Sequence, residues 1–249
     1  MNKWIIGARP RTLPAAVAPV VVATALAGSD ASLFPALLAL IVSLSLQVGV
    51  NYANDYSDGI RGTDADRVGP TRITASGLAT PASVKAAAFI SFGVGAVAGL
   101  GLAVMTSWWL IAVGLISILA AWGYTGGKNP YGYLGLGELF VFIFFGVVAT
   151  VGAFYVQTET ITANSLLASI PMGTFACALL AINNIRDRAL DAPAGKKTLA
   201  VRFGDRKARY FFATLITLGY VSALAIGNIW ILITLATAPM ALSLVRGVL

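Results

Sequence analysis

Two short polar clusters follow strongly apolar segments of this chain, and both combine carboxylates with amides. The first, Asn-Tyr-Ala-Asn-Asp-Tyr-Ser-Asp, spans residues 51–58; the second, Asn-Asn-Ile-Arg-Asp-Arg-Ala-Leu-Asp, spans residues 183–191. They contain four of the ten acidic residues of the chain. Carboxylates are costly to place in an apolar protein, so their grouping with amides and arginines indicates a site for a divalent metal and phosphate.

The spacing within each cluster suits metal binding from one face of a helix. If these segments are helical, Asn54 and Asp58 lie one turn apart, as do Asn183, Asp187 and Asp191 in succession. Each helix then offers a row of oxygen ligands, and two rows that face one another could hold a diphosphate through bridging Mg²⁺ ions. The basic residues near the clusters would neutralise the remaining phosphate charge: Arg61, Arg67, Arg72, Lys128, Arg186 and Lys196.

A simpler alternative is that both clusters are ordinary polar helix ends with salt-bridged loops. A single Asp–Arg pair would fit that interpretation, because exposed ion pairs are common and weak. Two matched clusters favour a functional site, because carboxylates rarely collect at membrane depth without a role.

The segments that must position these clusters are those of an integral membrane protein. Of the 249 residues, 58% are hydrophobic and 11% are charged, and the mean hydropathy is +0.83. Soluble domains have about 25% charged residues. Eight apolar segments are long enough to be expected to span a bilayer as helices: 12–28, 33–53, 85–105, 107–123, 134–156, 165–185, 210–226 and 228–245.

The basic residues predict the topology of these spans. With the eight segments alternating in direction, all seventeen Lys and Arg residues fall on one side, and the other side keeps only Asp30 and Glu159. The positive-inside rule makes the basic side cytoplasmic. The net charge of +7 is therefore a topology signal, and nucleic-acid binding is not expected. The N-terminus has no pattern of a removable signal peptide, so the first span is expected to stay.

Several chemistries are excluded by composition. The chain has no histidine, and Cys177 is its only cysteine. An intramolecular disulfide, a soft-metal site and a Ser-His-Asp triad are therefore not expected. Any metal should be hard and bound by oxygen.

The two clusters also suggest an internal duplication. Each follows an apolar segment and leads into a long basic loop, at about 57–82 and 188–208. We therefore expect one membrane-embedded domain over residues 1–249, built from two four-helix pseudo-repeats at about 1–124 and 125–249.

Some single residues have more than one interpretation. Glu138 could contact a polar substrate or cap the start of a helix. The aromatic run Phe140, Phe142, Phe144 and Phe145 is more typical of lipid-facing or packing surface. The residues expected to line a cavity, because they flank the polar groups, are Tyr52, Tyr56 and Tyr124.

Four motifs in order resemble the signature of the UbiA superfamily of intramembrane prenyltransferases. They are Asn54-Asp55-x-x-Asp58, Asp66-Arg67-x-x-Pro70-x-Arg72, Tyr124-x-x-x-Lys128 and Asp187-x-x-x-Asp191. The longer strings at 54–64, 131–138 and 194–202 resemble one branch, which prenylates 1,4-dihydroxy-2-naphthoate. The resemblance runs from Arg9-Pro10 to about Gly204.

The resemblance implies an all-α, multi-pass helical bundle around a central cavity open to lipid. It implies a bacterial plasma-membrane enzyme with its site toward the cytoplasm. Its reaction would be Mg²⁺-dependent transfer of a polyprenyl group from polyprenyl diphosphate to 1,4-dihydroxy-2-naphthoate, with loss of carbon dioxide, giving demethylmenaquinone. The family typically has nine spans, one more than the eight that we expect in this sequence, so the resemblance implies one further helix.

The resemblance also implies roles for individual residues. The expected holders of magnesium and diphosphate are Asn54, Asp55, Asp58, Asn183, Asp187 and Asp191, with the four carboxylates as the catalytic residues. The expected contacts to phosphate are Arg67, Arg72, Lys128 and Lys196, and Tyr124 is expected to close the site.

Two alternatives remain at this point. Another member of the same superfamily would act on a different acceptor, such as 4-hydroxybenzoate. A cation-coupled transporter would also carry membrane carboxylates, although its carboxylates should lie inside the spans rather than at helix ends beside basic loops.

Overall fold

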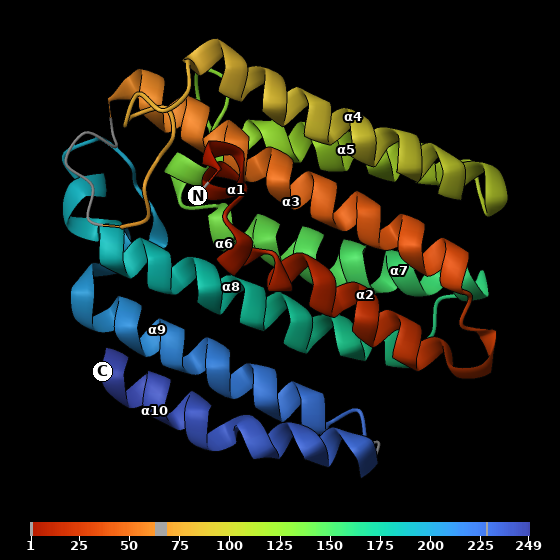
Figure 1. The fold of residues 1–249 in the computed structure, drawn as a ribbon. Coiled ribbons are helices and arrows are strands. Elements are labelled where there is room, and N and C mark those ends of the chain that lie inside the picture. The colour runs from red at the N-terminus through yellow and green to blue at the C-terminus, as the bar shows by residue number, and fades with distance from the viewer. Residues whose placement is uncertain (1, 63–68, 228) are drawn as a thin grey trace.

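The computed structural model describes residues 2–62, 69–227 and 229–249, and every regular element in these ranges is helical. The long helices lie side by side along one direction (Figure 1). The C-terminal ends of α3 (Leu33–Arg61) and α8 (Ala163–Asp191) lie at the same end of this bundle as both chain termini. Because each polar cluster occupies the last turns of one of these helices, the fold brings both clusters to one end.

The bundle is built from neighbouring antiparallel helices. The most extensive packing joins α3 to α4 (Pro81–Met105) and α8 to α9 (Leu199–Leu224). α2 (Pro14–Ala27) packs against both α3 and α8, as does a long helix formed by α6 (Gly137–Val141), the π-helix η4 (Phe142–Val148) and α7 (Ala149–Thr158). α5 (Trp109–Gly123) packs against α3 and α4. These elements form the wall of the cavity described below.

The structure has helices at each of the eight predicted spans, but their bounds differ from the prediction, and not every one is long enough to cross a membrane. In the described part of the chain, four helices are long and apolar enough to cross a membrane: α3, α4, Gly137–Thr158 and α8. A fifth crossing is possible if Lys3–Thr12 and Pro14–Asp30, which meet at 52°, form one bent span. The α5 helix has 15 residues, about 22 Å, which is shorter than the roughly 30 Å hydrocarbon core. The protein is a multi-pass membrane protein.

The seventh and eighth predicted spans differ most from the structure. A span was predicted to begin at 210, whereas α9 begins at Leu199, because the Thr198 side chain accepts a hydrogen bond from Val201 N and caps the helix. The helix then bends at Gly204, which has φ 74°. The eighth segment begins as a 3-10 helix (η5, Ile229–Thr237) and continues as α10 (Ala238–Val248).

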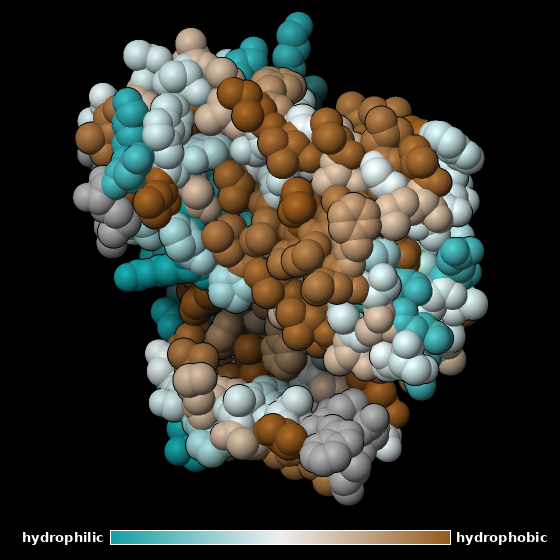
Figure 2. All heavy atoms as spheres, turned by 45° about the vertical axis from the view of Figure 1, so that its right-hand side comes forward, coloured by the Kyte–Doolittle hydropathy of each residue, from teal (hydrophilic) through white to brown (hydrophobic). Residues whose placement is uncertain are grey.

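Small residues allow the helices inside the bundle to approach closely. A Cβ on Gly146 of η4 would lie 2.7 Å from the Cα of Gly173 of α8, so only glycine fits at this crossing. Three clusters of buried apolar side chains form the core, the first around Val20, Leu102 and Phe154. Apolar atoms also cover most of the outer face in Figure 2, with hydrophilic atoms at its rims. This pattern is the one expected of a surface in contact with lipid.

Candidate functional site

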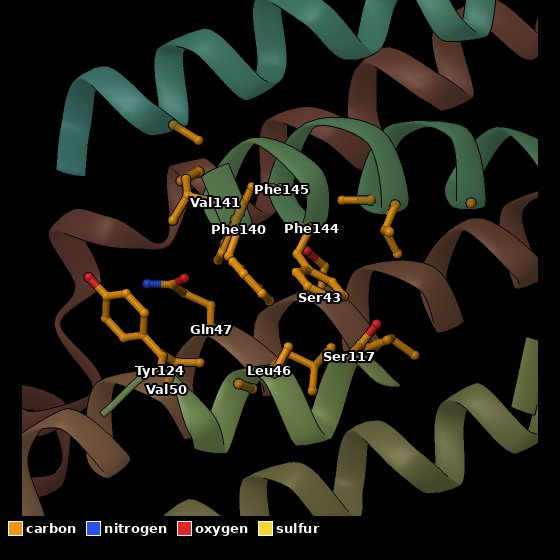
Figure 3. A pocket seen from close by; sticks show the side chains of 18 of the residues that line it. Ser43, Leu46, Gln47, Val50, Ser117, Tyr124, Phe140, Val141, Phe144 and Phe145 are labelled. Atoms are coloured by element: carbon orange, nitrogen blue, oxygen red, sulfur yellow. The ribbon is translucent and has the colours of Figure 1, made fainter. Parts of the chain in front are cut away.

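A cavity of about 300 Å³ lies between α2, α3, α5, the Gly137–Thr158 helix and α8. Several of its polar residues, among them Asn54, Asn183 and Tyr124, are at the end of the bundle where α3 and α8 finish. Its opposite part is lined by apolar residues such as Leu102 and Val156. Figure 3 shows Tyr124 and Gln47 at one end of this cavity and Phe144 and Ser117 toward the other. The cavity therefore joins a polar mouth to an apolar interior.

The two polar clusters meet at Lys196, in the loop between α8 and α9. Its Nζ lies 3.1 Å from Asp58 Oδ1, at the end of α3, and 3.7 Å from Asp191 Oδ1, at the end of α8. Arg72 Nη2 lies 4.0 Å from the other oxygen, Asp58 Oδ2. Lys196, Arg72 and Asp58 are all buried. The structure thus brings together residues that were predicted from both motifs.

The amides of the predicted rows face the cavity between the two helices. Asn54 and Asn183 both line it. Asn183 Nδ2 donates to the Leu179 carbonyl, and the amide oxygen of Asn183 takes no part in this hydrogen bond. Asn54 Oδ1 is buried without a hydrogen-bond partner among the described residues. A buried acceptor without a donor indicates a place for a ligand that is not protein.

Asp187 lies at the same end but is held by its neighbour. Arg186 Nε and Nη2 donate to its two oxygens at 2.7 Å and 2.9 Å, as a bidentate pair. This pair is partly exposed, because 34% of the Arg186 side chain is accessible. Asp187 is one helical turn from Asp191, as the spacing predicted.

The structure separates Asp55 from the other predicted ligands. Asp55 is fully buried, and its two oxygens accept hydrogen bonds from the backbone N–H groups of Ile73 (3.0 Å) and Thr74 (2.8 Å). Like Asp58, Asp187 and Asp191, it is not a cavity residue, but unlike Asp58 and Asp191 it has no contact with Lys196. Its contacts are those of a residue that fixes the loop after α3, and its role as a metal ligand stays a prediction.

The remaining predicted contacts are distributed unevenly. Glu138 is buried in α6, where its Oε1 accepts from Asn184 Nδ2 at 3.0 Å, and it is not among the cavity residues. Lys128 is exposed, and in the described part of the chain it forms no salt bridge. Arg67 lies outside the described residues. Tyr124 is a cavity residue, as predicted.

The described residues contain no group of three or more acidic, cysteine or histidine side chains arranged to hold a metal ion. Instead, the ammonium group of Lys196 lies between Asp58 and Asp191, and Asp58 is one helical turn beyond the cavity residue Asn54. Two carboxylates from different helices are therefore already drawn toward one cation. The donor set of carboxylates and amide oxygens is the type that Mg²⁺ prefers.

Tyr133 is the site residue that sequence reasoning missed. It lies in the 3-10 helix η3 (Tyr131–Leu134), and its hydroxyl donates to Asp58 Oδ1 at 2.5 Å. Burial raises the pKa of the Tyr133 phenol, and the Asp58 carboxylate raises it further, so the group is a hydrogen-bond donor at neutral pH. No spacing rule connects residue 133 with residue 58, so only the fold reveals this contact.

The aromatic predictions were partly wrong. Phe140 of α6 lines the cavity, and so do Phe144 and Phe145 of the π-helix η4. Tyr52 and Tyr56 do not line it: the Tyr52 hydroxyl donates to the Trp4 carbonyl, and Tyr56 stacks on Trp122.

The fold and the site define a class: a helical membrane protein with a polar, cation-rich mouth above an apolar cavity. The sequence matches the UbiA prenyltransferase family over residues 16–249, and the chain belongs to this family. This match confirms the resemblance seen in the motifs.

Two curated relatives extend the comparison. The chain is 51% identical over 244 residues to the 1,4-dihydroxy-2-naphthoate octaprenyltransferase of Mycobacterium tuberculosis, covering 96% of this chain and 84% of the relative. It is 37% identical over 260 residues to the enzyme of the same name from Escherichia coli, covering 99% of this chain and 84% of the relative.

A solved structure supports the fold. A UbiA homolog from Archaeoglobus fulgidus, bound to GPP and Mg²⁺, superposes with a TM-score of 0.69 at 16% sequence identity. The superposition covers 98% of this chain and 85% of the homolog. The predicted all-α bundle is therefore confirmed.

Proposed function

We propose that the protein transfers a polyprenyl group from polyprenyl diphosphate to 1,4-dihydroxy-2-naphthoate, with loss of carbon dioxide, to give the quinol form of demethylmenaquinone. The relatives named for this acceptor support the substrate. The observation that supports the chemistry most is the position of Lys196 between Asp58 and Asp191, with Asp58 one helical turn beyond the cavity residue Asn54. Groups suited to a diphosphate would then lie next to a space suited to an apolar chain.

The residues at the mouth fit a magnesium ion. The oxygens that would hold it are those of Asn54, Asp58, Asn183, Asp187 and Asp191, and the buried Oδ1 of Asn54, which accepts no hydrogen bond from the described residues, suits such an ion. When bound, Mg²⁺ supplies positive charge that stabilises the departing diphosphate. The homolog from Archaeoglobus fulgidus binds Mg²⁺ together with a prenyl diphosphate, which is consistent with this assignment.

Basic side chains would hold the diphosphate itself. Lys196 and Arg72 already contact Asp58, and Arg61 reaches the same place from the end of α3. These groups neutralise negative charge as the bond between the first prenyl carbon and the diphosphate oxygen breaks. Lys128 and Arg67 stay predicted phosphate contacts.

The apolar part of the cavity would receive the prenyl chain. Side chains such as Phe140, Phe144 and Leu46 keep water away from the allylic carbon as it gains positive charge. The electron pair of the ring carbon that bears the carboxylate then forms the new carbon–carbon bond, and carbon dioxide leaves from that carbon. Diphosphate is the other product, so atoms and charges balance.

The positive-inside pattern supports an active site toward the cytoplasm of a bacterial cell. Arg72, which follows α3 in the chain, and Lys196, which follows α8, both contact Asp58 at the end of α3 where the polar clusters meet. A diphosphate donor from the cytoplasmic leaflet could therefore enter directly.

The test is prenyl transfer by the purified protein in nanodiscs, with a polyprenyl diphosphate and either 1,4-dihydroxy-2-naphthoate or 4-hydroxybenzoate. We expect a prenylated naphthoquinol, equimolar carbon dioxide and no product in EDTA. Product from 4-hydroxybenzoate alone would contradict the acceptor, and absence of product from both would contradict the reaction.

A further inference from the structure

Tyr133 contacts side chains that belong to both halves of the site. Its hydroxyl donates to Asp58 Oδ1 at 2.5 Å. Its ring centroid lies 4.9 Å from Lys196 Nζ and 5.2 Å from Arg61 Cζ, both within the range of cation–π attraction. One side chain therefore touches a predicted metal ligand and two cations of the phosphate-binding region.

The backbone around Tyr133 is held independently of these side-chain contacts. The Lys197 N–H donates to the Tyr133 carbonyl at 2.8 Å, and Arg202 Nη2 donates to the Leu134 carbonyl at 2.8 Å. These bonds tie η3 to the loop that carries Lys196. The position of the Tyr133 ring relative to Lys196 is thus set by the backbone of both segments.

The contacts have different physical effects. A donor to a ligating carboxylate fixes its rotation, and removal of such an outer hydrogen bond typically lowers metal affinity about 10- to 100-fold. The ring offers a negative face to Lys196 and Arg61, which would otherwise repel one another near Asp58. The hydroxyl therefore acts on Asp58 and also accepts a 3.4 Å hydrogen bond from Arg61 Nη1, whereas the ring acts on both Lys196 and Arg61.

We propose that Tyr133 is a positioning residue that orients Asp58 for Mg²⁺ through its hydroxyl and holds Lys196 and Arg61 for diphosphate through its ring. The inference rests on the proposed function and adds to it a residue outside the four recognised motifs. Tyr133 does not line the cavity, so it acts through its neighbours rather than on the prenyl chain.

The experiment compares the wild-type protein, Tyr133→Phe and Tyr133→Leu in the prenyl-transfer assay at varied Mg²⁺. For Tyr133→Phe, which keeps the ring, we expect the Mg²⁺ concentration for half-maximal rate to rise about tenfold or more. The KM for the naphthoate acceptor should stay within about twofold of wild type, because the change acts on the metal side of the site. For Tyr133→Leu we expect an additional increase in the KM for the prenyl diphosphate.

Tyr56→Phe is the matched control. Tyr56 is two residues from Asp58 on α3, and its ring stacks on Trp122, with ring centroids 6.3 Å apart. This substitution should leave the Mg²⁺ dependence unchanged. A wild-type Mg²⁺ dependence in Tyr133→Phe would overturn the inference while leaving the proposed function intact. Equal increases in every KM, together with a lower melting temperature, would also overturn it, because they would show a scaffold role.

A second measurement does not depend on turnover. Binding of inorganic diphosphate with Mg²⁺ is measured by calorimetry for wild type, Tyr133→Phe, Asp58→Asn and the double variant. If Tyr133 acts through Asp58, its substitution should weaken binding in the wild-type background and change nothing in Asp58→Asn. Additive losses would contradict this coupling. A wild-type protein that neither binds diphosphate nor turns over would instead refute the proposed function.

Discussion

The Lys196 ammonium lies 3.1 Å from the Asp58 carboxylate, although one belongs to the loop after α8 and the other to the end of α3. The same ammonium lies 3.7 Å from Asp191. Without a cation between them, the buried carboxylate of Asp58 and the half-buried carboxylate of Asp191, from different helices, would repel one another. Lys196 is therefore the residue on which the joining of the two halves depends.

Removal of the Lys196 charge should weaken donor binding. For Lys196→Met, which keeps the chain length, we expect the KM for prenyl diphosphate to rise about tenfold or more, equivalent to ~1.4 kcal/mol. The acceptor KM should change little. Lys197→Met is the control, because Lys197 is exposed and only its backbone N–H contacts Tyr133. Equal effects of the two substitutions on steady-state kinetics would contradict this role.

Asp55 and Asp58 should differ in what their loss costs. Asp55→Ala leaves the buried N–H groups of Ile73 and Thr74 without their acceptor, so we expect a loss of about 2–5 kcal/mol in the free energy of unfolding. Asp58→Asn should abolish turnover with a melting temperature close to wild type. Thermal unfolding in detergent, measured together with activity, distinguishes the effects of Asp55→Ala and Asp58→Asn. A stable but inactive Asp55→Ala variant would instead favour a ligand role for Asp55.

The apolar end of the cavity should limit the length of the prenyl chain. Gly152 lines the cavity, and a Cβ at this position would meet nothing within 4 Å, so Gly152→Leu fills free space without strain. We expect long-chain donors to lose turnover by about tenfold or more relative to C10 and C15 donors. Gly93→Leu is the control, because Gly93 of α4 is exposed, equally open and not a cavity residue. If Gly152→Leu leaves the donor preference unchanged, the prenyl chain does not reach Gly152 in the cavity.

The crossing of η4 and α8 should tolerate no side chain at Gly146. A Cβ there would lie 2.7 Å from Gly173 Cα and 2.9 Å from the Ser169 carbonyl oxygen, both of which are backbone atoms. Gly146→Ala should therefore cost about 1–3 kcal/mol through overpacking, or roughly 2–4 °C in melting temperature per kcal/mol. Gly93→Ala, at an exposed position of α4 where a Cβ would meet nothing within 4 Å, should not lower the melting temperature in this way. Equal melting temperatures for the two variants would contradict the tight crossing.

Local spacing predicted much of the site. Asn54 and Asn183 line one cavity, and Asp58 and Asp191 meet at Lys196, because helical periodicity fixes which residues share a face. Periodicity could not distinguish Asp55 from Asp58, because the partners of Asp55 come from the loop at residues 73 and 74. Tyr133 was missed for the same reason: its contact with Asp58 is purely tertiary.

The fold was predicted in class more accurately than in detail. Apolar length identified the helices, but α9 begins before its apolar part, at a Thr198 cap followed by basic residues. The π-helix at Phe142–Val148 could not be read from composition, and two of its residues, Phe144 and Phe145, line the cavity. The two pseudo-repeats at about 1–124 and 125–249 stay a prediction.

The most direct test of a single site shared by both helices is Mg²⁺-dependent binding of inorganic diphosphate, measured by calorimetry in nanodiscs for wild type, Asp58→Asn and Asp191→Asn. Asp58 is on α3 and Asp191 is on α8, so a shared site predicts that either substitution alone removes most of the binding, and that both together remove no more. Binding that persists in one single variant, or that needs no Mg²⁺ in the wild-type protein, would contradict it.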